Sequence, residues 1–176
     1  MSWRPDLTVA AIVERDGRYL MIEERVGNRM VFNQPAGHVE RGESMVTAVV
    51  RETLEETARH FVPEALVGIY AWDQPERQRS FLRITFCGRT GEQDSLRALD
   101  RGIVRTLWMT RDQLAARGPR LRSPMVLRCI DDYAAGKRFP LDLLNHLSAA
   151  PETHLHIKAE ARSLGVLQSG APSDPN

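Results

Sequence analysis

Apolar and polar residues follow strand-like patterns over much of the chain. Residues 7–13 form an apolar, β-branched run, which predicts a buried strand. Asp16-Gly17 predicts a tight turn into a hairpin partner at 18–24, which places Leu20 and Ile22 on one face and Glu23 on the other. Four further strands are predicted at 30–33, 65–73, 79–88 and 103–109.

Helical spacing appears at three places between these strands. Ser44 is a suitable N-cap for a helix reaching about residue 59, and Thr110 for a short helix reaching about residue 117. Ser123-Pro124 predicts the start of a third helix, which Gly136 ends. Residues 34–38 and 88–102 are predicted as loops, so the chain is expected to be a mixed α/β domain.

The composition loosens toward the C-terminus, where 168–176 is rich in Ser, Pro, Gly and Asp. We therefore predict one domain at 1–148 and a mobile tail at 149–176. His154 and His156 have the spacing of a metal pair on a strand, but in such a tail we interpret them as solvated.

The overall charge argues against a nucleic-acid or membrane partner. The 176 residues carry a formal net charge of +1, whereas such binders usually show a strong basic excess. No apolar run approaches 18 residues and the start is not a secretory signal, so we expect a cytoplasmic protein with no DNA or membrane partner. Cys87 and Cys129 are expected to be buried free thiols, and both a monomer and a homodimer remain open.

The helix expected after Ser44 ends in a dense group of carboxylates. Glu52 lies three residues before Glu55 and four before Glu56, so the three side chains are neighbours. Like charges at this spacing weaken a helix by about 0.2–0.5 kcal/mol per pair. Arg51 could compensate them, and so could a hard cation such as Mg²⁺, which prefers oxygen ligands. A solvated acidic face is the alternative.

The spacing around these glutamates resembles the signature of the Nudix hydrolases. Gly37 is followed at fixed intervals by Glu43, by the pair Arg51-Glu52 and by the pair Glu55-Glu56. The family pattern also expects an aliphatic residue, a glycine and a second aliphatic residue. This chain departs from it there with Thr53, Ala58 and Arg59.

The resemblance implies a fold and a chemistry. It implies an α/β/α sandwich with a mixed sheet, and hydrolysis of a nucleoside diphosphate linked to another group with Mg²⁺ or Mn²⁺. It implies that Glu52, Glu55, Glu56 and the carbonyl of Gly37 bind the metal. By the same resemblance Arg51 orients the glutamates and Glu43 makes an outer-sphere metal or water contact. The general base varies in the family and is not assigned.

The resemblance extends over about residues 7–144 to one group of bacterial phosphatases in this family, with matching segments at 32–38, 81–83, 121–124, 132–133 and 136–141. It implies release of orthophosphate from nucleoside tri- and diphosphates and from hydroxymethylpyrimidine diphosphate. A Nudix pyrophosphatase acting on ADP-ribose or dinucleoside polyphosphates is the first alternative. A catalytically silent ligand-binding regulator is the second, and the intact glutamates disfavour it.

Several other residues have both a functional and a structural interpretation. Arg83, in mid-strand, is predicted to bind substrate phosphate unless it points to solvent. Glu23 could serve as a base or in nucleotide recognition, although solvent exposure is favoured. Trp72 could stack on a substrate ring or pack in the core. His38 is expected to shape its loop, and Asp100 could supply a carboxylate from a late loop.

Overall fold

The structure is a computed structural model that describes residues 3–147. This part of the chain contains seven strands: β1 (Asp6–Arg15), β2 (Arg18–Val26), β3 (Arg29–Asn33), β4 (Ala36–His38), β5 (Phe61–Gln74), β6 (Arg79–Thr90) and β7 (Ile103–Thr110). It also contains the helices α1 (Met45–Thr57), α2 (Arg111–Ala115) and α3 (Met125–Ala134), and the 3₁₀ turns η1 (Pro75–Arg77), η2 (Gly118–Arg120) and η3 (Leu141–Leu143).

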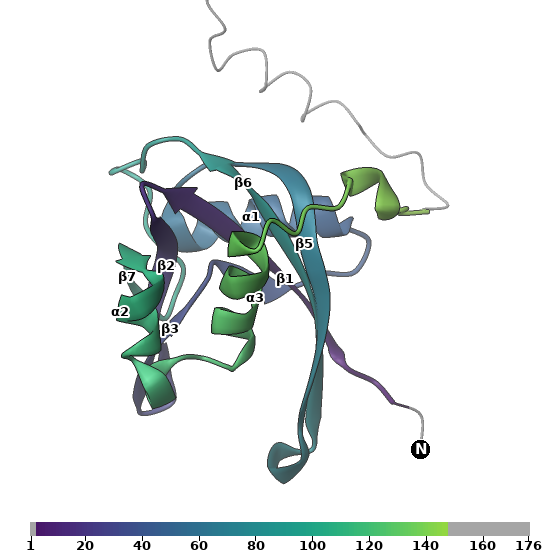
Figure 1. The fold of residues 1–176 in the computed structure, drawn as a ribbon, viewed down its shortest axis with the longest axis horizontal. Helices are drawn as coiled ribbons and strands as arrows, with labels where there is room; N and C mark the ends of the chain where they lie inside the picture. The colour runs from purple at the N-terminus through teal and green to yellow at the C-terminus, as the bar shows by residue number, and fades with distance from the viewer. Residues whose placement is uncertain (1–2, 148–176) are drawn as a thin grey trace, which may run out of the picture. The chain divides into compact units, whose positions relative to one another are not determined.

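The strands form a mixed sheet in the order β3-β2-β1-β6-β5, with β4 added to β1 and β7 to β2. Strands β1 and β6 are parallel, and the other pairs are antiparallel. Figure 1 shows α1 and α3 on opposite sides of the strands. Two buried clusters fill these layers, one including Leu20 and Val49 of α1, the other Met21 and Ile130 of α3. The predicted α/β/α sandwich is confirmed.

The segment predicted as a loop at 34–38 is partly a strand. Ala36–His38 forms β4 and pairs with β1, so that Gly37 lies opposite Val9 and His38 opposite Thr8. Three residues are too few to show a period, which is why the pattern predicted a loop. The consequence is that the signature glycine is held by the sheet.

Several element ends differ from prediction, two of them for a clear physical reason. Helix α1 stops at Thr57 because Ala58 adopts the left-handed conformation, with φ 53°, where its N–H bonds to the carbonyl of Leu54. Strand β5 begins at Phe61, four residues early, because Pro63 and a register shift hide its alternation. The short helix after Thr110 and the helix after Pro124 are present, and each ends about two residues before its predicted end, at Ala115 and Ala134.

Cys87 and Cys129 are buried free thiols, as expected. In the described part of the chain, no helix is long and apolar enough to cross a membrane. The predicted tail at 149–176, with its two histidines, lies outside the described residues. The domain boundary placed after residue 148 therefore stays a prediction.

Candidate active site

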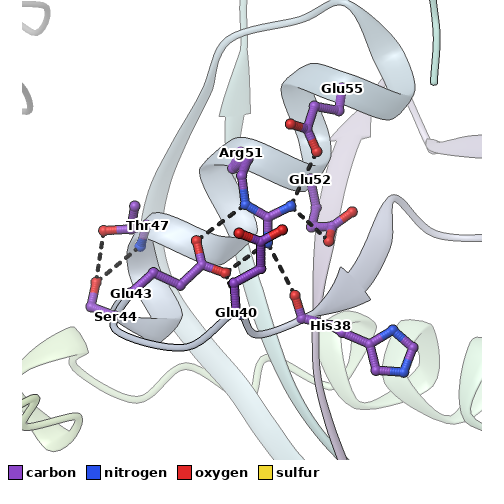
Figure 2. A network of polar contacts seen from close by, with 8 residues as sticks. All are labelled: His38, Glu40, Glu43, Ser44, Thr47, Arg51, Glu52 and Glu55. Atoms are coloured by element: carbon purple, nitrogen blue, oxygen red, sulfur yellow. Dashed lines mark hydrogen bonds and ion pairs between the residues drawn. The ribbon is translucent and has the colours of Figure 1, made fainter.

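The start of α1 fixes which face of the helix carries the glutamates. Ser44 caps the helix, because its Oγ accepts a hydrogen bond from the N–H of Thr47 at 3.0 Å. From this start, the helix brings Arg51, Glu52 and Glu55 beside the loop that follows β4, as Figure 2 shows. These three side chains of α1 therefore lie together at one site.

Arg51 is the centre of a hydrogen-bond network (Figure 2). Its Nε and Nη2 donate to the two carboxylate oxygens of Glu43 at 3.1 and 2.6 Å. Its Nη1 donates to Glu52 at 2.9 Å and to Glu55 at 3.1 Å, and Nη2 also donates to the carbonyl of His38 at 3.0 Å. One guanidinium thus ties α1 to the β4 segment and holds three carboxylates.

Gly37 is required by the close approach of Glu52. A Cβ built on Gly37 would lie 2.0 Å from the Cδ atom of the Glu52 carboxylate. No side chain fits into that space, so only glycine lets the carboxylate lie against the β4 backbone. The predicted pairing of a Gly37 carbonyl with Glu52 at one metal is compatible with this contact.

Glu56 is the most buried carboxylate of the site, with 8% of its surface exposed. One of its oxygens accepts a hydrogen bond from the N–H of Ala36 at 2.7 Å. Burial raises the pKa of Glu56 well above its ordinary value, and the nearby carboxylates of Glu52, Glu24 and Asp100 raise it further. Burial also raises the pKa of Glu52, against the opposing effect of Arg51.

These carboxylates suit a hard divalent cation. Within residues 3–147 no three His, Cys, Asp or Glu side chains are already gathered at ligand distances. However, buried carboxylates with raised pKa values lack compensating positive charge, and Glu52 and Glu55 share the single guanidinium of Arg51. A cation with oxygen ligands would supply the missing charge, so the donor set fits Mg²⁺ or Mn²⁺.

A cavity of about 460 Å³ opens beside the glutamates. Glu52, Glu55 and Glu56 of α1 line it together with Asp100. The backbone N–H of Asp100 donates to the carbonyl of Glu55 at 2.9 Å, which holds the late loop against the end of α1. The structure therefore places Asp100 where the sequence suggested a late carboxylate.

Arg83 lines the same cavity from the sheet floor. In the sheet it is paired with Thr8 on one side and with Tyr70 on the other. Only 5% of the residue is exposed, so the solvent-facing alternative is wrong. Its one hydrogen bond to the described protein runs from Nη1 to Gln34 at 3.4 Å, and Nε has none. Burial lowers the pKa of this guanidinium. An anion in the cavity would compensate it.

Trp72 and His38 also line this cavity. The indole of Trp72 stacks on Phe81, with ring centroids 5.6 Å apart and planes 23° from parallel. Trp72 is thus packed on one face and still borders the cavity, which keeps both of its predicted roles open. The backbone carbonyl of His38 accepts a hydrogen bond from Arg51, and the role of the His38 side chain stays a prediction.

Two of the predicted site residues lie outside the lining of the cavity. Glu23 is buried against Arg105 and Arg120, which donate to its two oxygens at 2.7 and 2.8 Å. The solvent-exposed alternative for Glu23 is therefore wrong as well, and the strand directs it to the face opposite Glu24. Glu43 stands behind Arg51, and the hydrogen bonds from that guanidinium lower its pKa despite partial burial.

Several polar residues of the lining had no functional role in the sequence analysis, among them Glu24, Asn33, Arg122 and Ser123. Glu24 had a detectable signal, because it follows Leu20 and Ile22 on the apolar face of its strand. A carboxylate at such a position is unusual and points to a site. The others lie at element ends, where no periodicity marks a direction.

Fold, signature and cavity together define the class of protein. The sequence profile of the NUDIX domain matches residues 4–129. The chain belongs to the Nudix hydrolase family, and it is a hydrolase of phosphoric anhydride bonds.

Individual members of the family are similar to this chain in sequence or in structure. Proteins named Phosphatase NudJ from Shigella boydii and Escherichia coli are 32% identical to it over 142 residues, covering 81% of this chain and 92% of theirs. A solved NUDIX hydrolase from Nitrosomonas europaea is 46% identical, with a TM-score of 0.81, and the match covers 84% of this chain and 100% of that one. A MutT NUDIX hydrolase from Burkholderia pseudomallei, at 19% identity and a TM-score of 0.63, shares the fold.

Proposed function

We propose that the protein is a metal-dependent phosphatase of nucleoside tri- and diphosphates that releases orthophosphate and also accepts hydroxymethylpyrimidine diphosphate. The observation that carries the proposal is that groups of opposite charge line one cavity: the carboxylates of α1 and the buried guanidinium of Arg83. A phosphate chain with its cation complements both groups. The likeness to proteins named Phosphatase NudJ favours a phosphatase over other reactions of the family.

In this proposal Glu52, Glu55, Glu56 and the carbonyl of Gly37 hold Mg²⁺ or Mn²⁺. The cation would neutralise phosphate charge and lower the pKa of a bound water. Arg51 keeps Glu52 and Glu55 oriented through its two hydrogen bonds, and Glu43 fixes Arg51 from behind. Loss of Glu43 is therefore expected to act through Arg51 and to be milder than loss of a metal ligand.

Arg83 binds phosphate oxygens from the sheet side. Its burial excludes water from the contact, which strengthens a charge-assisted hydrogen bond to an anion. Trp72, bordering the cavity, provides an apolar surface for the organic part of the substrate. Asp100 and Glu56 are the candidates for the group that takes a proton from water, since both line the cavity near the other carboxylates.

Product analysis tests the reaction. The protein is incubated with GTP and Mg²⁺, and orthophosphate is separated from pyrophosphate. We expect orthophosphate with GDP and then GMP, and next the same release from hydroxymethylpyrimidine diphosphate. Pyrophosphate with GMP, or no turnover, would contradict the phosphatase reaction, and AMP with ribose phosphate from ADP-ribose would support the alternative pyrophosphatase.

The metal site has its own test. Glu55→Gln and Glu56→Gln together should abolish Mg²⁺-dependent turnover, because both remove a charged oxygen ligand without changing side-chain size. The matched control is Glu64→Gln, an exposed glutamate on β5 that pairs with Arg89. Turnover that survives the double change would exclude these glutamates as metal ligands.

A further inference from the structure

The active-site cavity carries a set of buried polar atoms that the Nudix signature does not use. They lack a hydrogen-bond partner among the described residues, and each belongs to a residue that lines the cavity: Thr8 Oγ1, Glu24 Oε1, Asn33 Oδ1, Arg83 Nε and Ser123 Oγ. Four of these residues are at least 94% buried. Buried polar groups are nearly always paired, so the partner is what occupies the cavity.

The positions of these atoms show that several elements build one surface. Thr8, Glu24, Asn33 and Arg83 come from four different strands, and Ser123 precedes α3. Arg122, the neighbour of Ser123, places its Nε 3.4 Å from Glu24 Oε1 as an ion pair. The Glu24 carboxylate is thereby kept close to the cavity wall while its Oε1 still lacks a hydrogen bond.

The chemistry of these atoms excludes a phosphate as their only partner. A phosphate oxygen accepts hydrogen bonds, which suits Arg83 and the two hydroxyls. It cannot satisfy Glu24 Oε1 or Asn33 Oδ1, because these are acceptors themselves. An organic ligand that pairs all five atoms must therefore donate hydrogen bonds to the two acceptors as well as receive them. An exocyclic amino group on a heteroaromatic ring has two N–H donors, and the ring nitrogen beside it is an acceptor.

We propose that Glu24 and Asn33 select an amino-substituted ring by accepting hydrogen bonds from its exocyclic amine. Arg83 and Ser123 donate to acceptors on the same substrate, and Trp72 covers the ring face. The inference rests on the proposed function in taking the substrate as a phosphorylated ring compound. Amino-bearing nucleobases and the aminopyrimidine of hydroxymethylpyrimidine phosphate share this chemistry. A ring with an oxo group in place of the amine would bring its oxygen against the acceptor oxygens of Glu24 and Asn33, where no hydrogen bond can form.

Binding of monophosphates tests the proposal without requiring hydrolysis. Dissociation constants are measured by calorimetry for two matched pairs, CMP with UMP, and hydroxymethylpyrimidine monophosphate with its 4-oxo analogue. We expect the wild-type protein to bind the amino member at least about tenfold more tightly, since a mismatched charged acceptor costs about one order of magnitude or more. Whichever pair shows the preference identifies the source of the ring.

Variants connect that preference to the residues. Glu24→Gln can turn an N–H toward an oxo group, so the ratio within the preferred pair should fall to about twofold or less. Asn33→Ala should reduce it in the same direction, and Glu64→Gln should leave it unchanged. A wild-type ratio below twofold in both pairs, equal weakening of both members in Glu24→Gln, or no binding of any monophosphate would overturn the proposal. A retained ratio without orthophosphate release would overturn only the proposed phosphatase reaction.

Discussion

At the scale of a single residue, Arg83 is a buried charge that the proposed phosphate contact would compensate. Its guanidinium is buried in the sheet floor, and no carboxylate accepts a hydrogen bond from it among the described residues. Burying a charge away from water costs on the order of several kcal/mol unless a partner group compensates it. Under the proposed function, an anion in the cavity would supply this compensation.

Arg83→Met is therefore expected to separate stability from function. The apolar replacement removes the uncompensated charge and keeps most of the volume, so the Tm of the ligand-free protein should rise by about 2–4 °C for each kcal/mol gained. In contrast, kcat/KM should fall by at least about 30-fold, as for loss of one charged partner. Thermal unfolding and steady-state kinetics measure both effects. A lower Tm together with unchanged kcat/KM would show that Arg83 has only a structural role.

At the scale of one element, the end of α1 departs from the family pattern at a strained position. Ala58 occupies the place of the signature glycine, with φ 53° and ψ 34°. The left-handed conformation costs a non-glycine residue about 1–2 kcal/mol. The alanine methyl is buried and returns about 0.8 kcal/mol of this. The strain term is the larger one.

Ala58→Gly should therefore stabilise the protein slightly, by less than about 1 kcal/mol, or about 1–3 °C in Tm. Ala58→Val is the matched comparison, because a branched side chain tolerates positive φ still less. It should lower Tm by more than the glycine raises it. If the valine variant is as stable as the alanine protein, the left-handed helix end does not persist in solution.

A second element-scale feature joins α3 to β5. Asp132 of α3 accepts a hydrogen bond from the Tyr70 hydroxyl at 3.1 Å, and Lys137 and Arg128 approach it to 2.8 and 3.1 Å. The hydrogen bond with Lys137 is the largest cause that lowers the pKa of Asp132 below its ordinary 3.8. Both cations are largely exposed, so solvent screens the gain to about 1 kcal/mol.

The sign of the pH effect follows from that lowered pKa. Well above pH 3.8 the carboxyl is ionised in both the unfolded and the folded states, and the stabilisation is fully present. It is lost as the pH falls through the folded pKa. Asp132→Asn should thus cost about 1 kcal/mol at pH 7 and progressively less below pH 4 in urea unfolding. The control is Asp73→Asn, a change at an exposed aspartate of β5. A loss of stability in Asp132→Asn that is equal at pH 7 and below pH 4 would contradict the prediction.

At the scale of the whole molecule, the sequence predicted more of the layers than of the cavity. Strong periodicity and capping residues gave the strands and helices to within a few residues, and the spacing from Gly37 to Glu56 gave the acidic face of α1. The cavity wall was harder to predict, because it joins side chains from six strands, β1 to β6, and from the segment before α3. Glu23 and Glu24 illustrate the limit, since only the burial of each face decides which of two adjacent carboxylates enters the site.

Carboxylates also link the stability of the whole molecule to the proposed metal. Burial raises the pKa values of Glu24, Glu52 and Glu56, all of which line one cavity. At neutral pH their ionisation opposes folding, because the folded state holds these protons more tightly than the unfolded chain. A divalent cation bound to the folded state alone offsets that cost. Metal binding should therefore appear as added thermal stability, even without substrate.

Adding Mg²⁺ to the protein after treatment with EDTA should raise its Tm, since a ligand at 100 times its Kd contributes about 2.7 kcal/mol, or roughly 5–10 °C here. The double variant Glu52→Gln with Glu56→Gln should start from a higher Tm in EDTA, because two buried charges are gone, and should gain almost nothing from Mg²⁺. NaCl at matched ionic strength is the control for screening of surface charges. An equal rise in both proteins would locate the stabilising cation away from α1, and with it the reaction that we assign to this cavity would lose its metal.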